Sequence, residues 1–273
     1  MKITSYRPEI IFLIITLLVS LGGFWHLFLG ESANPEPHHF LHLITSLLWL
    51  SLILIQLMYI TKRKFSLHRK IGLSIFIIAP LTVATVAYLS VHSASRALAT
   101  GQPDILIVQN VMITLELGLV IFLAFLLMKS RLIHGNLLLA SSLFFLGIAL
   151  FFALMGFIPQ LKIEGPDTFY RFGIAASTAK AICAGIGLVF FLKNWKIGWP
   201  WLLVPACFYM NDFINSKLYE YDKIQDLTAW VGSMSESMTF FITLIVFTLL
   251  LLMAWKINGR LKGFNINTSF KNR

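Results

Sequence analysis

Histidine offers the widest choice of chemistry among the residue types in this chain. The sequence contains seven histidines, and almost all of them lie at the ends of long apolar segments. Five of them flank the first three segments, namely His26, His38, His39, His42 and His92. Imidazole binds iron, copper and zinc, and polar rings are costly inside a bilayer. The distribution therefore indicates a metal or haem site where the segment ends meet.

Helical spacing narrows this group to three. His26 lies midway between two glycines at four-residue spacing, and His42 and His92 each lie on a polar helical face. We expect these three to converge as metal ligands, or His42 and His92 to bind haem b with His26 as an alternative ligand. His38 and His39 are expected to be hydrated loop residues. The alternative is that all five are interfacial residues bonded to water and lipid head groups.

Two further histidines, His68 and His134, begin later segments on the opposite side of the membrane. Arg69 follows the first of them, and Arg131 precedes the second by three residues. Such pairs can hold an anionic group, for example the propionates of a second haem. They can equally be ordinary basic residues of the membrane boundary.

Two charged residues fall inside apolar segments. Glu116 and Lys180 are expected at depths of about 16 and about 12 Å from the outer surface, at 1.5 Å per residue. An unpaired charge at that depth is costly, so we expect the two to form a buried pair. The pair would be either a proton relay in a substrate path or a structural ion pair that fixes helix register.

The composition decides which elements hold these residues. Hydrophobic residues make up 58% of the chain and charged residues 12%, roughly half the charge of soluble proteins. We predict an all-α, polytopic membrane helix bundle that forms one transmembrane domain over residues 1–273. Segments of about 18–24 apolar residues can cross a bilayer. Eight such segments are expected, near 10–29, 39–60, 71–91, 105–128, 136–158, 172–192, 197–214 and 238–256.

The charge distribution orients these eight segments. Most lysines and arginines lie in one set of segments, near 2–7, 62–70, 129–131, 193–196 and 256–273. Most acidic residues lie in the other connecting loops. Because basic residues are retained in the cytoplasm, the pattern predicts eight transmembrane helices with both termini cytoplasmic. The net charge of +10 is explained by this cytoplasmic rim and does not indicate nucleic-acid binding.

Short motifs around the histidines carry a resemblance. The stretches 39–42 (HFLH), 67–72 (LHRKIG) and 79–81 (APL), with the later His134, resemble a family of uncharacterised bacterial multi-pass membrane proteins. That family shares a Leu-His-Arg-x-x-Gly element and has no assigned reaction. The resemblance covers roughly residues 38–150 and implies a protein of the bacterial inner membrane. The chain is also loosely similar to histidine-ligated b-type cytochromes, although its fourth segment has no histidine.

Three functions are consistent with these residues, and whether the protein is an enzyme stays open. The first is a haem- or metal-binding protein of membrane redox chemistry, with a quinone or another redox partner in the lipid bilayer. The second is a transporter or proton-coupled carrier that uses Glu116 and Lys180. The third is a membrane-embedded metal hydrolase, similar to the ceramidase-like group in helix number and triple histidine. That group places its paired histidines on a late helix, unlike this chain.

Overall fold

The computed structural model describes residues 6–30, 33–102 and 104–260, and these form helices without any strand. The all-α prediction is therefore confirmed. Lys2 and the basic residues after Arg260, which entered the charge prediction, lie outside the described residues. The helices are α1 (Arg7–Gly23), α2 (Trp25–Leu29), α3 (Pro37–Thr61), α4 (Phe65–Gly72), α5 (Ile75–Thr100), α6 (Ile107–Leu126), α7 (Arg131–Ala140), α8 (Ser142–Phe157), η1 (Pro159–Leu161), η2 (Pro166–Thr168), α9 (Tyr170–Lys193), α10 (Pro200–Glu220), α11 (Ile224–Gly232) and α12 (Glu236–Arg260).

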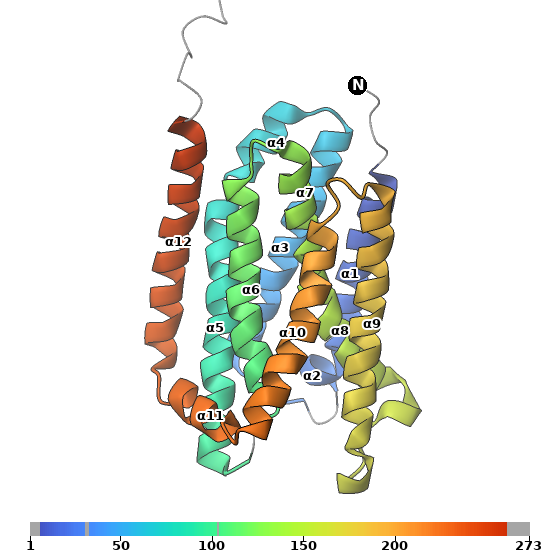
Figure 1. Ribbon diagram of the computed structural model, residues 1–273, viewed down its shortest axis with the longest axis vertical. Coiled ribbons are helices and arrows are strands. Elements are labelled where there is room, and N and C mark those ends of the chain that lie inside the picture. The colour runs from blue at the N-terminus through green and yellow to red at the C-terminus, as the bar shows by residue number, and fades with distance from the viewer. Residues whose placement is uncertain (1–5, 31–32, 103, 261–273) are drawn as a thin grey trace, which may run out of the picture.

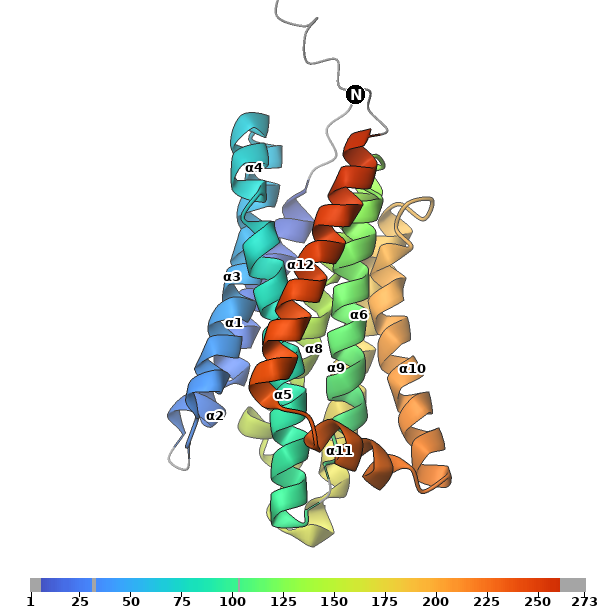
Figure 2. The ribbon, with the colours of Figure 1, turned by 90° about the vertical axis from the view of Figure 1, so that its left-hand side faces the viewer.

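The long helices run side by side along one axis, and their connections gather at two ends (Figure 1). One end carries α2, α11 and the connection between α5 and α6, and is called here the α11 end. The other carries α4 and the connections α6–α7 and α9–α10, and is called the α4 end. The N-terminal end of α1 and the C-terminal end of α12 both lie at the α4 end (Figure 1, Figure 2).

Seven helical stretches within the described residues are long and apolar enough to cross a membrane. They are Arg7–Leu29, Pro37–Thr61, Ile75–Thr100, Ile107–Leu126, Arg131–Phe157, Pro166–Lys193 and Glu236–Asn258. Each corresponds to one of the expected segments, and the chain is a multi-pass membrane protein suited to a lipid bilayer. Helix α10, which covers the expected segment 197–214, is not among the seven, although it packs against α6, α7 and α9.

Helix α5 lies at the centre of a group of helices in the bundle. It packs against α3, α6, α11 and α12 (Figure 2). Its interior hydroxyl groups are satisfied within the helix, as when Thr82 donates to the carbonyl oxygen of Ile78 at 2.8 Å. The helix ends at Gly101, whose φ of 65° is the left-handed conformation that glycine adopts without strain. The position of α5 therefore decides which residues of α3 and α12 meet.

Glycine also permits the tight contact between α1 and α8. A Cβ atom at Gly23 would lie 2.2 Å from the carbonyl oxygen of Ala149, so only glycine allows this approach. Helix α1 ends there, and α2 continues beyond Phe24. This contact fixes the side of the bundle on which α2 and its histidine lie.

Candidate metal centre

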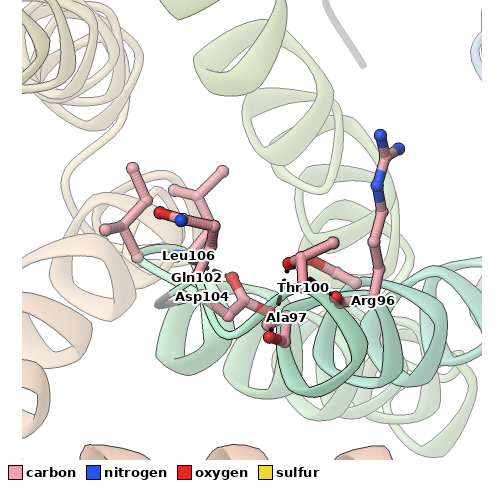
Figure 3. Close-up of a pocket in the computed structure, with 8 residues that line it drawn as sticks. Arg96, Ala97, Thr100, Gln102, Asp104 and Leu106 are labelled. Atoms are coloured by element: carbon pink, nitrogen blue, oxygen red, sulfur yellow. Dashed lines mark hydrogen bonds between the residues drawn. The ribbon is translucent and has the colours of Figure 1, made fainter.

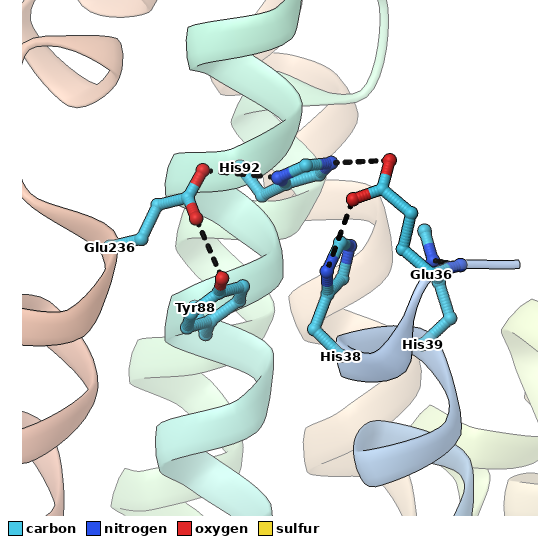
Figure 4. Close-up of polar contacts among 6 residues, drawn as sticks. All are labelled: Glu36, His38, His39, Tyr88, His92 and Glu236. Atoms are coloured by element: carbon cyan, nitrogen blue, oxygen red, sulfur yellow. Dashed lines mark hydrogen bonds and ion pairs between the residues drawn. The ribbon is translucent and has the colours of Figure 1, made fainter.

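A cluster of imidazole and carboxylate groups lies at the α11 end, where α3, α5 and α12 meet (Figure 4). Glu36 precedes α3, and His38 and His39 are in its first turn. His92 comes from α5, and Glu236 is the first residue of α12. Three parts of the chain that are far apart in sequence therefore contribute to one group of side chains.

The N-terminal turn of α3 positions Glu36, His38 and His39. Pro37 occupies the first turn, where its fixed φ suits a helix and its missing N–H costs nothing. The backbone N–H of Glu36 donates to Nδ1 of His39 at 3.0 Å, within a capping box. His39 thus caps the N-terminus of α3, and the Glu36 carboxylate is held beside the ring of His38.

Three ligand atoms of the cluster face one another at distances too long for hydrogen bonds. Oε2 of Glu36 lies 3.7 Å from Nδ1 of His38, and Oε1 lies 3.9 Å from Nε2 of His92. One atom from each of these residues lies within 4.8 Å of the others. Figure 4 shows both rings turned toward the same carboxylate. The space between the atoms can hold a cation.

The neighbours of His92 determine which of its nitrogens faces that space. Its Nδ1 lies 3.0 Å from Oε1 of Glu236, and the Tyr88 hydroxyl donates to Oε2 of the same carboxylate at 2.6 Å. A carboxylate only accepts, so Nδ1 carries the proton and Nε2 presents a lone pair. Nε2 of His92 has no hydrogen-bond partner among the described residues. A lone pair facing the Glu36 carboxylate is repulsive unless a cation or a proton lies between them.

His38 has a similar unsatisfied nitrogen. Its side chain is only 10% exposed, and its Nε2 has no hydrogen-bond partner in the described parts of the chain. The rings of His38 and His92 lie close together, with centroids 4.0 Å apart. Each of the two rings therefore has one nitrogen without a hydrogen-bond partner among the described residues.

A cavity of about 510 Å³ adjoins the cluster, between α3 and α12 and over α5. Its size is within the range of small-molecule sites, about 300–1,000 Å³. Its polar end is formed by the cluster and the rest by apolar side chains. The lining residues are Glu36, Pro37, His38, Leu41, Thr85, Tyr88, Ser237, Phe240 and Phe241. A ligand in this cavity would have its apolar part against the two phenylalanines and its polar part beside the imidazoles.

His42, which was predicted to pair with His92, contacts other residues in the structure. His42 lies one turn deeper on α3 than His38, where its Nδ1 is 3.2 Å from Oγ1 of Thr85. Its Nε2 is 3.5 Å from the hydroxyl of Ser46. Both ring nitrogens are thus engaged by hydroxyl groups, and His38 takes the place beside His92. The expectation that His38 is a hydrated loop residue is wrong, because α3 begins earlier than expected.

His26 does not join the cluster either. It lies in α2, is exposed, and packs on Phe157 with ring centroids 5.0 Å apart. A Cβ atom at Gly156 would lie 2.4 Å from Cδ2 of His26, so the ring rests directly on the backbone of α8. The reason is the close contact between α1 and α8, which carries α2 away from α5. The predicted triad of His26, His42 and His92 is not formed.

The two remaining histidines lie near the α4 end. Nδ1 of His134 is 2.7 Å from the carbonyl oxygen of Ala124. In the orientation that satisfies both of its ends, the Gln56 amide donates to the ring and carbonyl oxygen of His68 and accepts from the Gly72 amide. Burial lowers the pKa of His68, which favours its neutral form. Both rings thus serve contacts between neighbouring segments.

The predicted pair of Glu116 and Lys180 is replaced by two other pairs. Nζ of Lys180 lies 2.6 and 2.5 Å from the two carboxylate oxygens of Asp212. Glu116 instead accepts a hydrogen bond of 3.0 Å from Nδ2 of Asn211. Helix α10 causes the difference, because it lies against both α6 and α9 and brings Asn211 and Asp212 to their polar residues.

A second cavity, of about 400 Å³, lies at the tip of the α11 end beside the connection of α5 to α6 (Figure 3). Arg96, Thr100 and Asp104 are among its lining residues. Oδ1 of Asp104 accepts a hydrogen bond of 3.0 Å from the Leu106 amide, and Thr100 donates to the backbone of its own helix. These polar groups stabilise the chain locally and form no group of converging ligands.

Sequence reasoning missed both carboxylates of the cluster. Glu36 was a loop residue without a role, and Glu236 lies 144 positions from the His92 that it contacts. The stretch Glu36-Pro37-His38 contained a usable signal, because a proline favours the first turn of a helix and so moves the start of α3 to before His38. Nothing local to Glu236 indicates its partner. Comparisons with protein-family models, with curated proteins and with solved structures returned no match.

Proposed function

We propose that this protein binds a divalent transition metal at the α11 end, through Glu36, His38 and His92, for redox chemistry in the membrane. One observation supports this most strongly: three ligand atoms face one another beyond hydrogen-bond distance, and the proton of His92 is held on the far nitrogen by Glu236. Two imidazoles and one carboxylate with open positions form a ligand set that iron(II) and zinc take.

The separations suit an ion after a small adjustment. Ligand atoms bound at about 2.0–2.1 Å in a tetrahedral site lie about 3.3–3.4 Å from one another. The observed separations of 3.7 and 3.9 Å join the two imidazoles to different oxygens of Glu36, and one ligand atom from each residue lies within 4.8 Å of the others. The Glu36 side chain is 47% exposed, so rotation of its carboxylate can bring an oxygen closer to the imidazoles, and small shifts of the two rings complete the site.

The proposed metal keeps positions free on the side of the cavity. Three protein ligands with an open position are typical of catalytic rather than structural metal sites. The aromatic side chains Phe240 and Phe241 give the cavity an apolar wall, which suits a quinone or another apolar redox partner from the bilayer. A zinc ion in the same place would favour hydrolysis, because zinc has no redox chemistry.

Ring spacing favours a single metal ion over haem b at this position. Two imidazoles on opposite faces of one haem have ring centroids about 6 Å apart, because the porphyrin lies between them. The rings of His38 and His92 have centroids only 4.0 Å apart. The observed separation leaves no room for a porphyrin between these two rings.

Metal analysis of the full chain, purified in detergent without chelators, tests this proposal. We expect a single transition-metal ion per chain, lost in His92→Ala and in Glu36→Gln. His26→Ala is the matched control, because that ring lies at the same end of the bundle outside the cluster, and its metal content should equal that of the wild type. Metal-free wild-type protein, or full metal content in both cluster variants, would contradict the proposal. A reduced-minus-oxidised spectrum with a b-type band would assign haem instead.

We further propose eight transmembrane helices with both ends in the cytoplasm of a bacterial cell, within the inner membrane. The place of α10 beside α6, α7 and α9 supports the eighth span, as does its length of 21 residues. Its polar residues Asn211 and Asp212 are paired with Glu116 and Lys180, which lowers their cost in the membrane.

Cysteine labelling from outside the cell separates eight spans from seven. Lys196→Cys and Asp222→Cys place exposed thiols at the two ends of α10, and the native cysteines are buried. With eight spans, a membrane-impermeant maleimide labels only Asp222→Cys in intact spheroplasts. With seven spans, the two positions lie on one side and are labelled alike, which would contradict the proposal.

A further inference from the structure

Glu116 and Asn211 form an isolated polar pair in the middle of the bundle. Glu116 is the tenth residue of the 20-residue α6, and Asn211 is near the middle of α10. The two residues are 4% and 1% exposed. Both helices run the length of the bundle (Figure 1), so the pair lies far from either end.

The pair has one hydrogen bond and two unsatisfied oxygens. Nδ2 of Asn211 donates to Oε2 of Glu116 at 3.0 Å. Oε1 of Glu116 and Oδ1 of Asn211 are buried and have no partner among the described residues. Both atoms are acceptors if the carboxyl group is ionised. One hydrogen between these two oxygens would give both of them a hydrogen-bond partner. Without it, each is a buried acceptor that lacks a donor, which is costly.

The charges around the pair give an ionised carboxylate no compensation. The titratable group that acts on Glu116 is the uncharged thiol of Cys207 on α10. The described residues of α5, α7, α11 and α12, which also pack on α6 or near it, bring no interacting charge. Lys180 is held by both oxygens of Asp212. A negative charge at Glu116 would thus be buried and unpaired, which is strongly unfavourable.

We propose that Glu116 and Asn211 form a proton-binding site, in which Oε1 of Glu116 carries an exchangeable proton and donates it to Oδ1 of Asn211. The carboxylic acid and the carboxamide then make a ring of two hydrogen bonds, one in each direction. Loss of the proton leaves two acceptors facing each other, which favours a rotation of the amide or a shift of α10. Asp212 is the next residue, so such a shift also changes its contact with Lys180.

This site is independent of the metal centre. It lies on α6 and α10, and its ligand is a proton taken from water. The site would bind one proton per chain near the middle of the membrane. Release of this proton would be coupled to the position of α10. A proton-coupled change of conformation requires such a group.

Infrared spectroscopy of the wild-type protein tests the proposal. A protonated carboxyl group has a C=O stretching band that is separate from the amide and carboxylate bands. We expect such a band near neutral pH, a downward shift of it in D₂O, and its loss in Glu116→Gln. That variant is nearly isosteric and neutral, so it is expected to fold. A band that is absent from the wild type, retained in Glu116→Gln, or unchanged in D₂O would each overturn the proposal.

Two further variants test the assignment. Glu9→Gln is the matched control, because Glu9 is also buried but forms an ion pair of 2.6 Å with Lys193. The band should remain in that variant, and its loss would overturn the assignment to Glu116. Asn211→Leu should raise the frequency of the band, because both hydrogen bonds of the ring are lost. Asn211→Ala replaces it if the larger side chain prevents folding, and an unshifted band in the folded variant would exclude the ring.

Discussion

The histidine cluster at the α11 end and the polar residues halfway along the bundle hold their carboxylates at different distances from their cationic or imidazole neighbours. In the cluster, Glu36 lies 3.7 and 3.9 Å from its two imidazole neighbours, and one nitrogen of each ring has no hydrogen-bond partner among the described residues. In the centre, Lys180 and Asp212 are in contact at 2.5 Å. Side chains at a helix end lie near water and can be held apart, whereas charges in the middle of a membrane must be paired. Open spacing therefore indicates a place for an added cation, and closed spacing indicates structure.

The sharpest test of this contrast is the ion pair in the centre. Lys180→Met leaves the charge of Asp212 without its partner at the middle of a membrane helix, and we expect a loss of about 2.5–3.5 kcal/mol in the free energy of unfolding. Unfolding in mixed micelles measures it, and the double variant Lys180→Met with Asp212→Asn should recover most of the loss. Lys217→Met is the control, since its pair with Glu220 is exposed and should contribute less than about 1 kcal/mol. Equal stability of the two lysine variants would show that the central pair is not structural.

The next largest effect is expected beside the proposed metal. Glu236→Leu removes the acceptor that holds the proton on Nδ1 of His92, and such outer partners change metal affinity by about 10–100-fold. Competition with a chromophoric chelator measures this loss. Ser237→Ala, the adjacent change in the same cavity, should leave the affinity unchanged. An unaltered affinity in Glu236→Leu would mean that His92 is oriented by other contacts.

A smaller effect separates the two histidines of α3. His42→Ala removes hydrogen bonds to Thr85 and Ser46 and should cost about 1 kcal/mol of stability, with the metal content unchanged. His38→Ala should give the reverse result, a loss of metal in an apo-protein of nearly normal stability. Metal loss in His42→Ala would restore the pairing expected from helical spacing and would contradict the observed cluster.

The smallest effect is expected on the pH dependence of stability, through His68 at the α4 end. Burial lowers the pKa of His68, so the unfolded chain binds its proton first as the pH falls through about 6.5. The unfolded state then binds more protons than the folded state, and stability decreases toward acid. His68→Gln should therefore show a smaller difference in Tm between about pH 8 and about pH 6 than the wild type. Lys70→Gln changes an exposed charge on the same helix that is not among those acting on His68, and it should retain the wild-type difference.

The predictable part of the site was the face of each helix. Periodicity placed His92 on a polar stripe of α5, and the structure uses that stripe for Tyr88 and His92. Periodicity could not show whether His38 or His42 lies beside His92, because the start of α3 depends on the cap formed by Glu36 and Pro37. Depth counting placed Glu116 and Lys180 at comparable levels, yet it could not show that α10 lies between them and binds both.

The sequence by itself determined that the chain folds as membrane helices, since apolar runs of sufficient length have no other stable form in a bilayer. It also determined which side chains must avoid lipid. Only the tertiary structure decided the partners: Glu236 for His92, Asp212 for Lys180 and Asn211 for Glu116. Helical periodicity specifies directions around one axis, whereas a contact also depends on which helix is the neighbour and how far it is shifted along that axis. Those two quantities follow from packing, as when Gly23 permits α1 to approach α8 and so removes His26 from the cluster.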